Sequence, residues 1–68
     1  MYNYSKLLGL MREKGITQEE LAKRIGISST TLNKRLKNNS QFQQDEMKEI
    51  LSTLGLTIED VVPIFYAN

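Results

Sequence analysis

Apolar residues recur along the chain at spacings of three and four, in short runs separated by glycines and small polar residues. This spacing is typical of the buried face of a helix. The first run predicts a helix over residues 4–14, and Gly15 is expected to end it because glycine readily takes the left-handed conformation that follows a helix. The apolar positions of this helix are Leu7, Leu8, Leu10 and Met11.

Two short helices are predicted next, joined by a turn of about three residues. Thr17 and Glu20 have the spacing of a capping box, in which each side chain accepts a hydrogen bond from the other residue's backbone N–H. A helix is therefore expected over residues 18–25. Ser28 is the expected N-cap of a third helix, which continues to about residue 37. The inward positions of the two helices are Leu21, Ala22, Ile25, Leu32 and Leu36.

The rest of the chain predicts a loop and two more helices. Asparagine, serine and glutamine at residues 38–41 favour a loop, because short polar side chains bond to nearby backbone groups. Phe42 within this polar stretch is expected to anchor the loop to the core. Helices are expected over residues 44–54 and, after a cap at Thr57, over residues 58–66.

These elements predict an all-α fold, a compact bundle of about five short helices in which the second and third form a helix-turn-helix. A chain of this length fits one domain, residues 1–68. It contains neither cysteine nor histidine, which excludes disulfides, thiolate metal sites and the commonest general base. The paired carboxylates come at helix starts, where the helix dipole explains them. We therefore expect no enzyme, no metal and no cofactor.

The apolar runs are shorter than a membrane span, and no signal-peptide pattern follows the first methionine. A cytoplasmic protein is therefore expected. The net charge of +1 conceals an uneven distribution: residues 1–22 balance, residues 23–40 carry +5 with no acid, and residues 41–68 carry −4. The basic segment suits phosphate binding, although a solvated basic helix face would have the same composition.

Residues 17–37 combine the features that a helix-turn-helix needs. Ala22 is small where the two helices would cross, Gly26 permits the turn, and Ile27 can fill the space beneath it. The outer face of the third helix is left with side chains that can hydrogen-bond and that have little apolar surface to bury. These side chains are Ser29, Thr30, Asn33 and Lys34.

Two motifs frame the predicted turn, Gly15-Ile16-Thr17-Gln18-Glu19-Glu20-Leu21-Ala22 and Ile25-Gly26-Ile27-Ser28. With them, residues 5–42 resemble the lambda-repressor-like DNA-binding domains of the phage Cro and xenobiotic-response-element families. The tail, with Phe42, Glu46, Ile50, Leu54 and a terminal Ile-Phe-Tyr, is similar to small Cro-like regulators of phages in Gram-positive bacteria. The resemblance implies a Cro/C1-type helix-turn-helix that binds double-stranded DNA in a sequence-specific way.

In domains of this type the third helix enters the major groove, and the start of the second helix meets the DNA backbone. The resemblance therefore implies base contacts by Ser29, Thr30, Asn33 and Lys34. It implies phosphate contacts by Gln18, Lys23, Arg35, Lys37, Asn38, Asn39 and Ser40. Each of these could instead be an ordinary solvated side chain, and Ser29 and Thr30 could serve only the start of the helix.

One position departs from the family pattern. The family usually has an apolar residue three places after the position of Leu32, where this chain has Arg35 followed by Leu36. An arginine buried without a partner would be costly. Either the third helix is rotated so that Leu36 packs inward, or Arg35 extends along its own stem toward phosphate.

The function implied by the resemblance is that of a phage-type Cro-like repressor, which blocks transcription by occupying operator half-sites on DNA in a bacterial host cell. A homodimer is expected, at least on DNA. The alternative is a helix-turn-helix modulator that binds a partner repressor. The basic segment favours DNA, since a purely protein-binding relative would not need five cations without an acid. Either function could use the terminal apolar cluster as an interface, namely Val61, Val62, Ile64, Phe65 and Tyr66.

Overall fold

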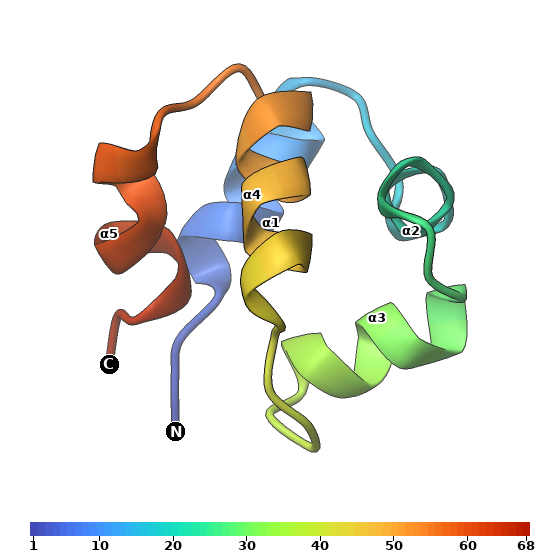
Figure 1. Cartoon of the computed structure of the whole chain (residues 1–68), viewed down its shortest axis with the longest axis horizontal. Helices are drawn as coiled ribbons and strands as arrows, with labels where there is room; N and C mark the ends of the chain where they lie inside the picture. The colour runs from blue at the N-terminus through green and yellow to red at the C-terminus, as the bar shows by residue number, and fades with distance from the viewer.

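The computed structural model describes all residues, 1–68, as helices and loops without a strand. The helices are α1 (Ser5–Glu13), α2 (Gln18–Ile25), α3 (Ser29–Leu36), α4 (Gln44–Thr53), a 3-10 turn η1 (Ile58–Asp60) and α5 (Val61–Phe65). The all-α prediction is confirmed. Figure 1 shows α4 in the middle of the molecule, with α5 on one side and α2 and α3 on the other. No helix is long and apolar enough to cross a membrane.

The helix starts follow the predicted side-chain chemistry. The Thr17 hydroxyl accepts from the Glu20 N–H at 3.1 Å, and the Glu20 carboxylate accepts from the Thr17 N–H at 3.4 Å, so the capping box is confirmed. Ser28 caps α3 by accepting from the Thr31 N–H at 3.1 Å. These side chains satisfy N–H groups that have no partner within their helices.

Four helices end in the same backbone motif, with a residue in the left-handed conformation. In α1, α2 and α4 this residue is a glycine, with φ between 68° and 79°. In α3 it is Asn38, with φ of 63°. The Asn38 N–H donates to the Arg35 carbonyl at 3.1 Å and the Asn39 N–H to the Lys34 carbonyl at 2.8 Å, the two bonds of a Schellman motif. The predicted loop at residues 38–41 is therefore an ordered helix end in its first half.

The core joins every helix. Leu7, Leu21, Leu32 and Ile50 come from four different helices and are fully buried, and Leu36 packs against them with part of its surface exposed. Phe42 is buried as predicted, and its ring meets those of Tyr4 and Phe65 edge to face, at centroid distances of 5.3 and 5.2 Å. Burial raises the pKa of Tyr4, and the neighbouring Tyr2 and Tyr66 add to this rise.

The predicted final helix over residues 58–66 is broken into η1 and the five-residue α5. Within α5, Ile64 and Phe65 are buried in the chain's own core, and Val61 packs against it. The expectation that Ile64 and Phe65 form an interface was wrong, because this face of α5 packs on α1 and α4. Three other apolar side chains of this segment, four residues apart along the chain, remain exposed: Ile58 (65% exposed), Val62 (61%) and Tyr66 (43%).

Candidate nucleic-acid interface

The turn between α2 and α3 is built as the sequence predicts. Gly26 takes the left-handed conformation, with φ of 79°, and the Ile27 N–H donates to the Ala22 carbonyl at 3.0 Å. Ala22 is buried, and Ile27 packs against the core from below the turn. Two short helices are thus held in a fixed arrangement, the geometry of a helix-turn-helix.

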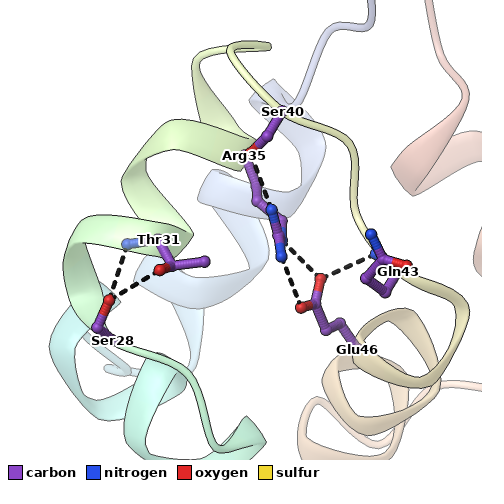
Figure 2. Close-up of polar contacts among 6 residues, drawn as sticks. All are labelled: Ser28, Thr31, Arg35, Ser40, Gln43 and Glu46. Atoms are coloured by element: carbon purple, nitrogen blue, oxygen red, sulfur yellow. Dashed lines mark hydrogen bonds and ion pairs between the residues drawn. The ribbon is translucent and has the colours of Figure 1, made fainter.

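Two of the hydroxyl side chains at the start of α3 bond to each other at the cap of the helix, and two others have no partner in the protein. Figure 2 shows Ser28 bonded twice to Thr31: its oxygen accepts from the Thr31 backbone, and its hydroxyl donates to the Thr31 hydroxyl at 2.9 Å. Ser29 and Thr30 are exposed, and their side chains make no hydrogen bond within the protein. The cap of the helix is therefore made by Ser28, which leaves the next two hydroxyls available.

The outer face of α3 brings together the four side chains expected to contact bases. Ser29, Thr30 and Lys34 are exposed, and Asn33 is half-buried. Residues 29 and 33, and 30 and 34, are one turn apart, so the four share one face. The side-chain hydrogen bonds at α3 are made by Ser28, Thr31 and Arg35, and none involves these four residues.

Basic and polar groups around this face are also unpaired. Lys23, Lys37 and Asn39 are exposed, and Gln18 is half-buried at the first position of α2. The molecule's one ion pair lies elsewhere, so Lys23 and Lys37 have no carboxylate within reach. No group of acidic side chains could hold a metal ion.

Arg35 does not extend toward solvent, so the second of the two possibilities for this residue was wrong. Its Nε and Nη2 donate to the two carboxylate oxygens of Glu46 at 2.7 and 3.0 Å, and its Nη1 donates to the Ser40 hydroxyl at 2.8 Å. The side chains of Arg35 and Glu46 are only 14% and 8% exposed. Figure 2 shows this guanidinium turned from α3 toward the start of α4. Leu36 packs against the core beside it, but Arg35 is held inward as well, by an acidic partner that neither possibility included.

The Glu46 carboxylate accepts hydrogen bonds from two parts of the chain, Arg35 in α3 and the backbone before α4. Its Oε1 also accepts from the Gln43 N–H at 2.8 Å, which caps the start of α4. Burial by itself would raise the pKa of Glu46, but the hydrogen bonds from Arg35 and Gln43 and the positive charge of Arg35 outweigh it. The pKa of Glu46 therefore lies below its ordinary value, and the side chain is a carboxylate at neutral pH.

Two other residues expected at phosphates have partners inside the protein. The Asn38 side chain accepts from the Tyr2 N–H at 3.0 Å and donates to the Tyr2 carbonyl at 2.8 Å. The Ser40 hydroxyl accepts from Arg35. The sequence predicts phosphate contacts for both, whereas in the structure their side chains fasten the loop after α3 to the N-terminal segment and to α3.

The sequence reading missed Glu46 as the partner of Arg35. The sequence explains Glu46 as an acid at the positive start of a helix, a place that it does occupy, and as one residue of the tail that resembles phage regulators. The sequence does indicate that Arg35 needs a partner, because an arginine at an inward position of α3 requires a buried acid. Which acid meets it depends on how α3 and α4 cross, since the two residues are eleven positions apart.

Comparison with known proteins agrees with this geometry. A family model described as helix-turn-helix matches residues 8–61, which include α2, the turn and α3. No curated protein matches the chain. Since the match covers most of the chain and the two helices lie as such a unit requires, the protein belongs to the Cro/C1-type helix-turn-helix family of DNA-binding transcription regulators.

Proposed function

We propose that this protein is a Cro-like repressor of phage type, which lays α3 in the major groove of operator half-sites and thereby blocks transcription. The observation that supports it most is the outer face of α3, where four polar side chains lie together with no partner in the protein. Exposed polar groups on a rigid helix beside unpaired cations are what direct reading of base edges requires.

Each of the four side chains has a base that suits it. Thr30 can place its methyl group against a thymine methyl, and Asn33 can form two hydrogen bonds with adenine. Lys34 can donate to guanine O6 and N7. Ser29, next to the cap, can donate to or accept from a base edge.

Phosphate contacts are proposed for the unpaired residues around this face. Gln18 lies in the first turn of α2, where backbone N–H groups without a helical partner favour an anion. Lys23, Lys37 and Asn39 are exposed and can reach the backbone from α2 and from the loop after α3. Arg35, Asn38 and Ser40 are left out of this set, because their side chains already have partners.

A homodimer on DNA is proposed because one eight-residue helix spans too few base pairs for useful specificity. The interface we propose is the apolar stripe of Ile58, Val62 and Tyr66, with Val61 at its edge. In Figure 1 this side of the molecule lies across α4 from α3. Two copies joined there would carry two reading helices, and paired half-sites about one helical turn, roughly 34 Å, apart require two.

The direct test is selection of bound DNA from a random pool, followed by affinity measurements at several salt concentrations. We expect a defined, roughly palindromic motif. Its affinity should fall by roughly 10³-fold or more between 50 and 200 mM salt if a dimer neutralises about six to ten phosphates. Failure to enrich any motif, together with a nearly flat salt titration, would exclude the proposal.

The exposed apolar stripe also favours the alternative, a modulator that docks on a partner repressor. Val62→Lys separates the two, because it places a charge in the middle of the stripe without disturbing buried residues. If the stripe is the dimer interface, this variant loses cooperative binding to paired half-sites and keeps its affinity for a single half-site. A modulator would show no selected motif in either form.

A further inference from the structure

The reading helix is attached to the rest of the molecule in two ways. Along most of its length α3 packs on α2, and Leu32 in its middle is fully buried. In its last turn Leu36 is only partly buried. There the ion pair of Arg35 and Glu46 is the one side-chain hydrogen-bonded link from α3 to α4. The end of α3 thus depends on a polar contact where the family usually has an apolar one.

This contact is directional. A leucine at this position could slide over its neighbours, whereas a planar guanidinium that faces both oxygens of a carboxylate accepts only a narrow range of angles. The third nitrogen of Arg35 bonds to Ser40, and the Glu46 carboxylate also holds the Gln43 backbone. The pair of Arg35 and Glu46 therefore fixes α3, the loop after it and the start of α4 with respect to one another (Figure 2).

Small rotations of α3 matter at its outer face. A side-chain tip about 5–6 Å from a helix axis moves by roughly 1 Å when the helix turns by about 10°. A functional site tolerates displacements of only about 0.5 Å. Asn33 and Lys34 directly precede Arg35, so whatever fixes the rotation of Arg35 fixes theirs.

A contribution to stability does not explain this pair well, because a buried ion pair often stabilises a protein no more than apolar groups of similar size would. We propose instead that Arg35 and Glu46 are positioning residues for sequence discrimination: they hold the rotation and tilt of α3 that bring its outer face to the base edges, without touching DNA. This inference rests on the proposed function, because it concerns the same reading face.

The test compares the wild-type protein with the double variant Arg35→Met/Glu46→Leu, which replaces the pair by apolar groups. The quantity measured is the discrimination ratio, defined as affinity for the selected operator divided by affinity for random DNA. We expect the variant to fold and its ratio to fall about 10-fold, the size of one lost base contact. The slope of log affinity against log salt should stay unchanged, since no phosphate contact is removed. Lys37→Ala is the matched control, with a slope reduced by about one and an unchanged ratio.

A readout without DNA accompanies it. Residual dipolar couplings of backbone N–H groups give the angle between α3 and α4, and we expect this angle to change in the double variant. An unchanged angle, or an undiminished discrimination ratio in the folded variant, would overturn the inference. A slope reduced by about one would also overturn it, because Arg35 would then be a phosphate contact.

The outcomes separate this inference from the function on which it rests. A wild-type protein that does not discriminate overturns the proposed function itself. A wild-type protein that discriminates, with a double variant that does so equally well, overturns only the positioning role. Should the double variant fail to fold, Arg35→Lys takes its place, because it keeps the charge and loses the planar fork. Reduced discrimination in Arg35→Lys supports the inference, and full discrimination overturns it.

Discussion

The two sides of α3 differ in how far the fold uses their side chains. On the inner side, Leu32 is fully buried, Leu36 packs on the core, and Arg35 has a partner for each of its side-chain nitrogens. On the outer side, none of the four polar side chains has a partner. The same helix thus divides its residues between building the protein and meeting another molecule.

Lys34 and Arg35 show this division most clearly, because they are neighbours with the same charge. Lys34 is exposed and unpaired, whereas Arg35 is paired with Glu46. Of the five positive charges in residues 23–40, one is therefore neutralised within the fold and 5 − 1 = 4 face solvent. A charge counted along the sequence is a charge available to DNA only if the fold leaves it unpaired.

The largest effect should come from the inner side. Leu32→Ala removes a fully buried side chain and leaves a cavity, so the free energy of unfolding should fall by about 2–5 kcal/mol. A chain of this length has a total stability of roughly 3–10 kcal/mol, so this variant should be partly unfolded. Urea denaturation followed by circular dichroism measures the loss. A change below about 1 kcal/mol would contradict the core described above.

Arg35→Met should come next. It leaves the Glu46 carboxylate buried without its cation, so the free energy of unfolding should fall by about 2–4 kcal/mol. The double variant with Glu46→Leu should recover most of this loss, and the matched control is Lys37→Met, an exposed cation on the same helix end, which should change stability by less than about 0.5 kcal/mol. Equal effects of Arg35→Met and Lys37→Met would show that the inner cation is no more engaged than the outer one.

Substitutions on the outer side should change DNA binding and leave the fold intact. Asn33→Ala and Lys34→Ala remove unpaired groups from a helix in which alanine is favourable, so the free energy of unfolding should change by less than about 0.5 kcal/mol. Binding to the selected operator should weaken by about 1–3 kcal/mol for each true base contact, and binding to random DNA much less. Unchanged affinity of both folded variants for both DNAs would favour the modulator function.

A fall in pH should selectively weaken the ion pair of Arg35 and Glu46. Since the pKa of Glu46 is lower in the folded than in the unfolded chain, the stability that its charge provides is complete above the unfolded pKa of about 4.3. It is lost as the pH falls through the folded pKa. Urea midpoints measured between neutral pH and this acid range should decline more steeply for the wild type than for Glu46→Gln, which has no charge to lose. Parallel curves would argue against a lowered pKa.

The smallest effect concerns the end of α3. Asn38→Ala forces a left-handed alanine and removes both bonds to Tyr2, so we expect a loss of about 1–2 kcal/mol in the free energy of unfolding. Asn38→Gly removes the same bonds but relieves the backbone, so its loss should be smaller. If the free energy of unfolding falls equally in the two variants, the left-handed backbone at residue 38 does not strain alanine.

Local chemistry explains why most of the fold could be predicted. The cap at Ser28, the capping box of Thr17 and the helix end at Gly26 depend on residues one to three positions apart, so the sequence alone states them. The inward leucines follow from helical periodicity. The outer face of α3 could be identified for the same reason, since it is the complement of those positions.

Contacts between distant residues account for what could not be predicted. Arg35 turns inward because Glu46 is in reach across two helices, and Asn38 is occupied because Tyr2, 36 residues away, runs past it. The C-terminal segment could not be predicted for another reason. A five-residue helix is too short for periodicity to distinguish Ile64 and Phe65, which face the core, from Val62, which does not.

The shared carboxylate of Glu46 also restricts how sequences of this kind can diverge. A substitution of Arg35 alone strands a buried anion, and a substitution of Glu46 alone strands a buried cation and frees the Gln43 N–H. Point mutations that lead from this pair to an apolar one must therefore pass through an intermediate that is less stable than either end. Related chains should accordingly carry both residues or neither, and a change of operator preference that requires a new tilt of α3 should arise by paired replacement rather than by gradual drift.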